Sequence, residues 1–471
     1  MATPPRAYLP DLLYARGKLW PGGALSVKDG AVVDVGEPAV GCAWIRLKGM
    51  ALLPGLASAH GHAFQRAIRG RTERRAAGRP DFWAWREAMY QAAARLGPDD
   101  LFAVARMAFH EMVRAGITCA GEFHYLHRDP AGRPYADVNE LAKQVARAAR
   151  EVGIRFALLR VAYARAGHGK PDDPLQRRFV EPSLDDALRA LDDLEAELCG
   201  DPLVSLGLAP HSVRACPAPW IERLAAESRR RSLPLHVHVS EQPAEVEACL
   251  SEHGVRPVAL LDRLGALFDS TTAVHAIHLD EAEIALLGKA RATVCACPTT
   301  ERNLGDGIVP ADRLLAAGVR LALGTDSNVQ VDLLEDARAL ECHLRLQRLE
   351  RAVLDPGGEG RGGEGRLDSL ARRLHGFASE GGMSSLGLPG GTLAPGDPAD
   401  FVVVRLDDPS IAGASEADLL PAAVFSMART AVRDVYVGGE PAILDGAAAG
   451  GRAPAAGVVR DFEAVMRRLW G

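Results

Sequence analysis

The sequence predicts an α/β fold, and its strand and helix repeats favour a TIM-like (β/α)8 barrel with a smaller β-rich domain beside it. From about residue 52 onward, short apolar segments alternate with segments whose apolar residues recur at helical spacing. Eight apolar segments are expected to form strands: 51–62, 117–124, 154–162, 203–210, 233–240, 271–276, 291–297 and 319–325. Eight strand–helix units in succession are typical of a closed barrel. A doubly wound sheet would show the same alternation, so the pattern alone leaves that alternative open.

The segments between these strands are expected to be amphipathic helices. In residues 185–198, leucines recur at helical spacing and acidic residues stand near the start. Residues 99–115 and 137–152 show similar spacing. Helices of this kind would cover the strands with their apolar faces.

Further strand-like segments lie outside the barrel region, at 24–27, 31–35, 392–404 and 432–437. The first two flank Asp29-Gly30, which is typical of a hairpin turn. We expect the two terminal regions to pair into one small domain. The predicted organisation is a first part of that domain at 1–55, the barrel at 56–385, and a second part at 386–471 that ends in a helix at 459–470.

The glycine-rich stretch 356–366 is low in complexity and is expected to form a flexible loop. It does not indicate phosphate binding, because no strand precedes it and no Gly-Lys-Ser/Thr follows. Its role is open.

Composition indicates an ordinary soluble protein. The 471 residues are 48% hydrophobic and 25% charged, and the net charge of -6 argues against nucleic acid or an anionic membrane surface as a partner. The N-terminus lacks the pattern of a signal peptide, and no apolar run approaches the roughly 18–20 residues that span a bilayer. The eight cysteines are scattered, which is typical of a reducing compartment. We therefore expect a cytoplasmic protein that binds neither nucleic acid nor membranes.

Polar residues with catalytic potential follow the carboxyl ends of six predicted strands. They are His60 and His62, Glu122, His211, His238 with Glu241, His275, and Asp326. In a barrel these ends meet at one rim, where the chemistry lies. A single His-x-His is more often a pair of surface histidines. Here, however, other candidate ligands are expected at the same rim, which argues for a shared site.

We predict that His60, His62, His238 and Asp326 bind one metal ion. Three imidazoles and a carboxylate, with a position left for water, suit a catalytic Zn2+. Fe2+ or Mn2+ could occupy the same donors. No suitable lysine stands at the end of the fourth strand, where a carboxylated lysine would bridge two metals, so a mononuclear site is favoured.

Three residues near these ligands are predicted to be catalytic. Glu241 follows His238 by three positions and is expected to shuttle a proton. His275 is expected to polarise the attacking water or the developing tetrahedral centre, and Asp326 to accept the water's proton. His236 shares the face of His238 but lies deeper in the strand, so we interpret it as a packed core residue.

Together these motifs resemble the amidohydrolase superfamily, specifically its mononuclear deaminase branch. The resemblance rests on Pro-Gly-x4-His-x-His from Pro54, His-x-x-Glu from His238, the histidine of the sixth strand, and Gly-Thr-Asp-Ser ending at Ser327. It covers essentially the whole chain, and it implies a composite β-sandwich built from both termini. Finer segments resemble the formimidoylglutamate deiminases of that superfamily, at 62–67, 81–86, 121–127, 210–214 and 297–307.

That finer resemblance implies hydrolysis of N-formimino-L-glutamate to N-formyl-L-glutamate and ammonia in histidine degradation, by a homodimer. The substrate would be a small dicarboxylate, and its carboxylates call for guanidinium partners. The residues implied in binding are Arg86 and Arg214, with Gln65, Tyr125 and His211 as hydrogen-bonding companions. We expect Arg86 to lie on a loop that acts as a lid or reaches a neighbouring subunit. His124 is ambiguous, and Tyr125 is the favoured substrate group at that strand end.

Two alternatives stay open. A guanine-type or triazine-type deaminase would need residues that stack on an aromatic ring and few arginines. A non-catalytic scaffold would have lost a ligand or Glu241, and here the set is complete. Departures from the family pattern are Arg302, Ala57-Ser58-Ala59 before His60, and the stretch 356–366, none of which removes a ligand.

Overall fold

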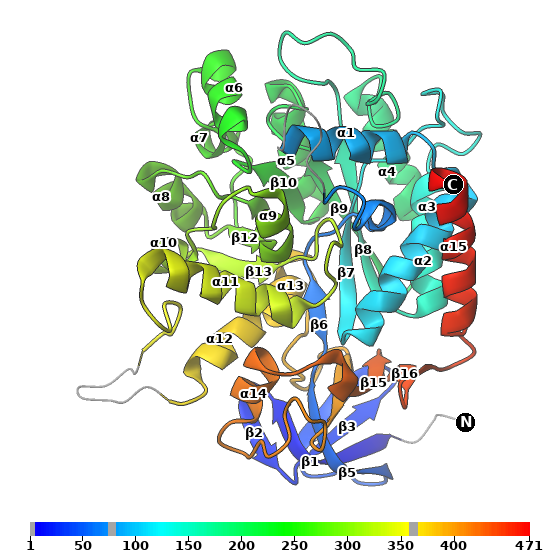
Figure 1. Ribbon diagram of the computed structural model, residues 1–471, viewed down its shortest axis with the longest axis vertical. Helices are drawn as coiled ribbons and strands as arrows, with labels where there is room; N and C mark the ends of the chain where they lie inside the picture. Colours follow the sequence, from blue (N-terminus) through cyan, green and yellow to red (C-terminus); the bar gives the residue numbers. More distant parts are fainter. Residues whose placement is uncertain (1–4, 74–81, 358–365) are drawn as a thin grey trace.

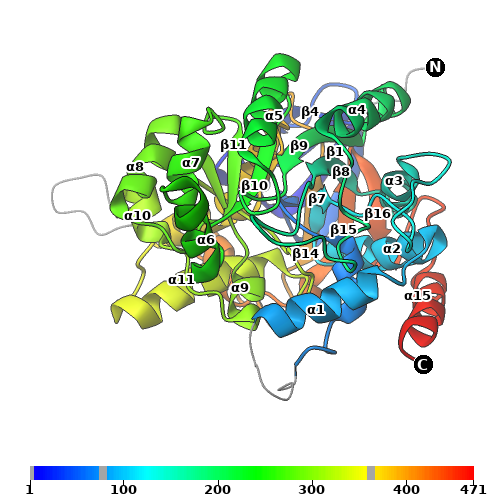
Figure 2. The same cartoon turned by 90° about the horizontal axis from the view of Figure 1, so that it is seen from above.

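The barrel is formed by parallel strands that follow one another around a ring (Figures 1 and 2). The computed structural model describes residues 5–73, 82–357 and 366–471. Within them, the eight-stranded sheet consists of β6 (Leu56–Ser58), β7 (Ile117–His124), β8 (Arg155–Ala162), β9 (Val204–Pro210), β10 (Leu235–Val239), β11 (Thr271–His275), β12 (Thr293–Ala296) and β13 (Arg320–Leu323). The order in the sheet is the order in the chain, which a doubly wound sheet does not have.

The first and last strands meet and close the ring. The backbone N–H of Ala59 donates to the carbonyl of Leu323 at 2.8 Å, and that of Asp326 donates to the carbonyl of His60 at 3.1 Å. The predicted (β/α)8 barrel is therefore confirmed.

One predicted strand is divided in two. The segment 51–62 was expected to be a single barrel strand, but Ala51 to Pro54 end β5 (Ala43–Pro54), which belongs to the other sheet. The chain changes sheets at Gly55, whose N–H donates to the carbonyl of Asp400 at 2.9 Å. A Cβ at Gly55 would collide with the side chain of Thr118, so only glycine fits this crossing.

Helices cover the outside of the barrel (Figure 2). They are α2 (Pro98–Arg114), α3 (Glu140–Val152), α4 (Leu184–Leu198), α5 (Ala218–Arg231), α6 (Pro243–His253), α7 (Pro257–Arg263), α8 (Glu281–Ala290), α9 (Pro298–Leu304), α10 (Ala311–Ala316) and α11 (Leu333–Arg348). The three helices predicted between barrel strands correspond to α2, α3 and α4. Local sequence sets their ends: Ser183 caps α4 by accepting the N–H of Asp186, and Gly153 ends α3 in the left-handed conformation.

The second sheet is mixed and combines strands from both ends of the chain, as predicted. Its strands among the described residues are β1 (Arg6–Ala15), β2 (Lys18–Pro21), β3 (Ala24–Lys28), β4 (Ala31–Gly36), β5, β14 (Phe401–Arg405), β15 (Val432–Val437), β16 (Glu440–Leu444) and β17 (Ala447–Ala448). The two terminal regions meet where β5 and β14 pair antiparallel. The predicted strand 392–404 is shorter than expected, because the carboxylate of Asp397 accepts the N–H of Ala394 and holds a turn before β14.

The remaining elements are η1 (Ala63–Ile68), α1 (Phe82–Ala93), α12 (Ser369–Ala378), α13 (Glu380–Ser385), α14 (Leu419–Phe425), η2 (Arg429–Ala431) and the terminal helix α15 (Ala455–Trp470). Figure 1 shows α15 alongside α2, and α1 across the upper rim of the barrel. Most of the predicted loop 356–366 lies outside the described residues, as does Asp81 of the segment 81–86.

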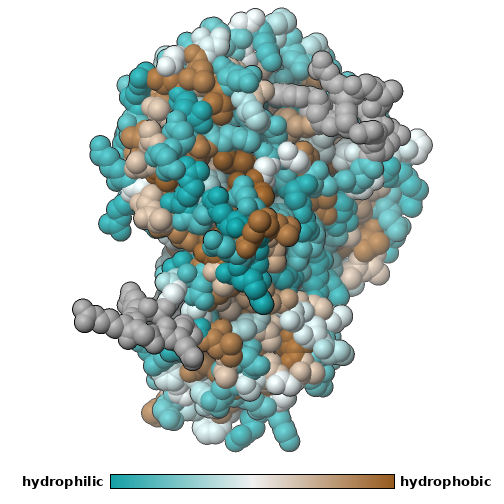
Figure 3. All heavy atoms as spheres, turned by 60° about the vertical axis from the view of Figure 1, so that its left-hand side comes forward, coloured by the Kyte–Doolittle hydropathy of each residue, from teal (hydrophilic) through white to brown (hydrophobic). Residues whose placement is uncertain are grey.

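Hydrophilic and hydrophobic residues are interspersed on the face shown in Figure 3. In the described part of the chain, no helix combines the length and the apolar character that crossing a membrane requires.

Candidate active site

Four buried side chains converge at the carboxyl ends of the barrel strands. They are His60 and His62, which follow β6, His238 on β10, and Asp326, which follows β13. One donor atom from each lies within 4.8 Å of the others. The Nε2 atom of His60 is 3.2 Å from that of His62 and 3.1 Å from that of His238. The structure therefore brings together the four predicted metal ligands.

Backbone carbonyls fix which ring nitrogens face the centre. Nδ1 of His62 lies 3.0 Å from the carbonyl of Phe123, and Nδ1 of His238 lies 3.1 Å from that of His211. A carbonyl only accepts, so each Nδ1 carries the proton and each Nε2 presents a lone pair to the centre. Burial lowers the pKa of His60 to about 3, which keeps that imidazole neutral as well.

The carboxylate of Asp326 completes the donor set. Its Oδ1 lies 3.2 Å from Nε2 of His62 and 3.4 Å from Nε2 of His60. Burial alone would raise the pKa of Asp326, but the imidazoles of His60 and His62 hold it well below its ordinary value. Lone pairs and a carboxylate oxygen at this spacing repel one another unless a cation lies among them, so the site fits a divalent metal.

The loop that carries Asp326 is held in an unusual backbone conformation. Asp326 has φ of 41°, in the left-handed region. Its carbonyl accepts the N–H of His62 at 2.9 Å and the side-chain amide of Asn328 at 3.2 Å. These contacts stabilise the strained residue and fix its carboxylate relative to the histidines.

Glu241 and His275, two of the predicted catalytic residues, lie beside the metal site. Oε1 of Glu241 is 3.6 Å from Nε2 of His275, whose ring stacks on His238 with centroids 5.5 Å apart. Burial raises the pKa of Glu241, so this carboxyl can hold a proton. Burial by itself lowers the pKa of His275, but the carboxylates of Glu241, Asp326 and Glu301 outweigh it and raise that pKa well above its ordinary value.

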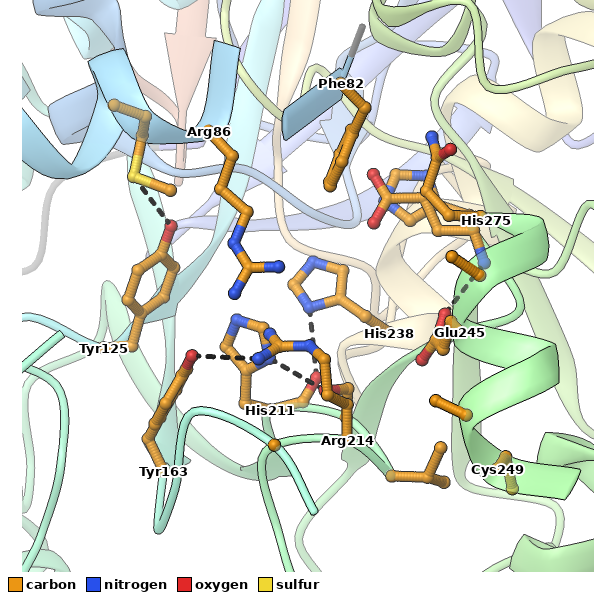
Figure 4. Close-up of a pocket in the computed structure, with 18 of the residues that line it drawn as sticks. Phe82, Arg86, Tyr125, Tyr163, His211, Arg214, His238, Glu245, Cys249 and His275 are labelled. Carbon is orange, nitrogen blue, oxygen red and sulfur yellow. Dashed lines mark hydrogen bonds and ion pairs between the residues drawn. The ribbon is translucent and has the colours of Figure 1, made fainter. Parts of the chain in front are cut away.

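A cavity of about 300 Å³ opens onto these groups. Besides His62, His238, Asp326, Glu241 and His275, its lining includes all of the predicted substrate residues, Gln65, Arg86, Tyr125, His211 and Arg214. Figure 4 shows the guanidinium groups of Arg86 and Arg214 entering the same space from opposite sides, beside His211 and His238. The cavity therefore joins a metal site to two cationic groups.

Several of these side chains are held in place. Nη1 of Arg214 donates to the carbonyl of Ala166 at 2.8 Å and to the hydroxyl of Tyr163 at 3.3 Å. Nε2 of Gln65 donates to the hydroxyl of Tyr125 at 3.0 Å. Arg86 lies on helix α1 and not on a loop as expected, because residues 82–93 form a helix across the rim.

Two further histidines near the site, His236 and His124, can be compared with their predicted roles. His236 is fully buried, with Nε2 2.9 Å from the carbonyl of Ser385, so its interpretation as a packed core residue is confirmed. His124 is buried but does not line the cavity, whereas Tyr125 does.

The sequence interpretation missed three residues of the site. Tyr163 follows β8, a strand end for which no candidate was named, so the rule of strand ends would have found it. Glu245 lines the cavity four positions after Glu241, in the first turn of α6, and its closeness in sequence to Glu241 was the available signal. Glu301 stood inside the segment 297–307 without a role, and nothing in the local pattern pairs it with His275.

Comparisons with known proteins agree with this architecture. The model of the amidohydrolase family matches residues 51–442. The formimidoylglutamate deiminase of Pseudomonas aeruginosa is 40% identical over 427 residues, which cover 90% of this chain and 91% of that protein. The 8-oxoguanine deaminase of the same organism is 32% identical over 453 residues, 94% of each protein. The crystal structure of an amidohydrolase from Brucella melitensis superposes with a TM-score of 0.88 at 31% identity, and the match covers 99% of this chain and 100% of that one. With its barrel and its cluster of metal donors, the chain belongs to the amidohydrolase family.

Proposed function

We propose that this protein hydrolyses N-formimino-L-glutamate to N-formyl-L-glutamate and ammonia. The observation that carries the proposal is the presence of Arg86 and Arg214 in the same cavity as the metal donors. A substrate with two carboxylates and a formamidine head would place its carboxylates on the two arginines and its formamidine group at the metal donors. The relative of 40% identity that is named for this reaction supports the assignment.

The substrate carboxylates would bind to the two arginines. Guanidinium groups bind carboxylates through paired, charge-assisted hydrogen bonds. Arg214 is already oriented by Ala166 and Tyr163, so little of its side-chain freedom is lost when substrate binds. Gln65, Tyr125 and His211 add hydrogen-bonding groups along the lining.

We further propose Zn2+ as the metal, held by His60, His62, His238 and Asp326. Three imidazoles and one carboxylate suit Zn2+, and Fe2+ and Mn2+ accept the same donors. A bound Zn2+ would lower the pKa of water towards neutrality and stabilise developing negative charge.

The protein's own groups would move the protons. Water adds to the carbon of the formamidine head, which binds as the protonated amidinium, and Asp326 accepts a proton from that water. His275 holds Nδ1–H on the carboxylate of Glu301 and, as a protonated ring, donates a hydrogen bond from Nε2 to the tetrahedral centre. Protonated Glu241 delivers a proton to the amino nitrogen of the intermediate, the carbon–nitrogen bond breaks, and ammonia leaves. The hydroxyl group on that carbon returns its proton to the Glu241 carboxylate and becomes the formyl carbonyl.

A purine-type deaminase is the second candidate. The aromatic side chains in the lining, which include Phe82, Trp85 and Tyr163, could stack on a flat ring. The relative of 32% identity that is named for 8-oxoguanine supports this alternative. Two guanidinium groups in one small cavity favour a dicarboxylate instead.

The test is ammonia release by the Zn2+-loaded protein from N-formimino-L-glutamate, N-formimino-L-aspartate, guanine and 8-oxoguanine. We expect fast release from the glutamate compound and none from the purines. Release from 8-oxoguanine alone would overturn the proposal and favour the second candidate. The aspartate compound measures the tolerance for a shorter chain, because one methylene contributes only about 1–3 kcal/mol of discrimination.

A further inference from the structure

Glu301 is a buried acid behind the active site that neither binds the predicted metal nor lines the cavity. It lies on α9, is 2% exposed, and takes no part in the proton transfers proposed above. Its Oε1 atom accepts two hydrogen bonds, from the backbone N–H of Cys297 at 2.8 Å and from Nδ1 of His275 at 3.3 Å. One anchored oxygen therefore contacts the side of His275 that faces away from Glu241.

The orientation of His275 depends on that contact. Its backbone has φ of 68°, a strained left-handed conformation that persists only where surrounding contacts stabilise it. On one face the ring stacks on His238 at an interplanar angle of 14°, and stacking alone permits rotation within the plane. An acceptor at Nδ1 fixes that rotation, and so directs Nε2 towards Glu241, 3.6 Å away.

We propose that Glu301 is a positioning residue, which holds His275 by its Nδ1–H so that Nε2 faces the reacting centre. The proposal rests on the proposed function for its kinetic test, but the contact itself is independent of the substrate. The oxygen is itself held by the Cys297 N–H, so the imidazole is oriented through the first turn of α9.

Two other roles for Glu301 must be separated from this one. It could serve only to stabilise the start of α9, or it could act as a metal ligand, since Nδ1 of His275, Sγ of Cys297 and a carboxylate oxygen of Glu301 lie within 4.8 Å of one another. A matched control exists for the first role. Asp336 accepts the N–H of Thr299 at 3.0 Å in the same turn of α9 and, within the described residues, forms no hydrogen bond or ion pair with His275.

The kinetic experiment compares Glu301→Ala, Glu301→Gln and Asp336→Ala in the metal-loaded protein. Glu301→Ala is expected to lower kcat by about 10- to 100-fold with little change in KM, the usual cost of losing such a supporting contact. Glu301→Gln should restore much of kcat, because an amide oxygen accepts the same two hydrogen bonds. Asp336→Ala should lower the unfolding temperature without this loss of kcat.

A double-mutant cycle adds a readout that a structural role would not change. In a His275→Asn background, Glu301→Ala should cost little further in kcat, because its effect passes through the imidazole. Equal losses in Glu301→Ala and Asp336→Ala, or additive losses in the cycle, would overturn the proposal. So would a second metal ion per chain that Glu301→Ala removes.

A substrate-free measurement keeps the test independent of the proposed function. In protein labelled with [15N]histidine, the Nδ1–H signal of His275 is identified by its absence from His275→Asn. It should be slow to exchange in the wild type and in Glu301→Gln, and broadened by exchange in Glu301→Ala. An unchanged signal in Glu301→Ala would overturn the proposal even if the substrate is a different one.

Discussion

The Nε2 atoms of His60 and His238 lie 3.1 Å apart, although 178 positions separate the two residues in the chain. Both atoms are buried, and the carbonyl that fixes the proton on Nδ1 of His238 leaves its Nε2 as an acceptor. Two ring nitrogens this close share a proton or a cation, and the Nε2 lone pairs of His62 and His238 beside the Asp326 carboxylate favour a divalent cation. The metal site is therefore a property of the closed barrel, because neither strand presents it alone.

The first prediction compares two histidines of one strand. His238→Gln should lose the bound metal, because it removes one of three imidazole ligands. His236→Gln should keep the metal but lower the free energy of unfolding by about 1–3 kcal/mol, since it disturbs a buried hydrogen bond to Ser385. Metal per chain and thermal unfolding measure both. Full metal content in His238→Gln would contradict the ligand assignment.

Removal of the metal should destabilise the whole barrel. A ligand that binds only the folded state stabilises it by about 4 kcal/mol when its concentration is 1,000 times its Kd. Dialysis against a chelator should therefore lower the unfolding temperature and abolish turnover, and added Zn2+ should restore both. An unfolding temperature that does not respond to chelation would argue against a metal held by these four residues.

Glu241→Gln should retain the metal and lose about 10²- to 10⁴-fold in kcat, because glutamine cannot shuttle a proton. Glu247→Gln is the matched control, since Glu247 is exposed on α6, the helix that follows Glu241. Metal analysis and steady-state kinetics test the pair. Normal turnover in Glu241→Gln would remove Glu241 from the proton transfer.

Arg86→Met and Arg214→Met should each raise KM for N-formimino-L-glutamate by about 10- to 150-fold, the equivalent of one charge-assisted hydrogen bond of 1.5–3 kcal/mol. Arg223→Met controls for loss of a positive charge, because Arg223 pairs with Asp185 at the surface. A KM that changes in neither cavity variant would show that these arginines do not bind the substrate.

Glu245 should make substrate binding depend on pH. Burial, together with the neighbouring Glu241, raises the pKa of Glu245 to about 7. Below that pH the carboxyl is neutral; above it, a negative charge appears in a cavity that binds a dianion. KM should therefore rise as the pH increases from about 6 to about 8.5, and Glu245→Gln should remove this rise while Glu247→Gln preserves it.

Profiles of KM against pH for the three proteins test this prediction. A rise that persists in Glu245→Gln would assign it to another group. A wild-type KM that does not change with pH would show that Glu245 keeps one charge state throughout.

The amino-acid sequence by itself determined the repeat of strands and helices, and with it the rim where the metal donors meet. Strand ends are recognisable locally, because an apolar run of about five residues stops where the chain leaves the core. His236 and His238 are two residues apart and so share one face of their strand, which means that the period of the strand could not tell the ligand from the core residue. Their different positions along the strand did so, and the structure confirms that His236 is buried.

Only the tertiary structure decided how segments far apart in the chain share space. It divided the strand 51–62 at Gly55, because the backbone there leaves β5 for the barrel and passes against Thr118. It placed Arg86 on a helix across the rim and Glu301 behind His275. Local sequence encodes which face of an element is buried, whereas the partner of a buried polar atom depends on packing between elements, which no local pattern records.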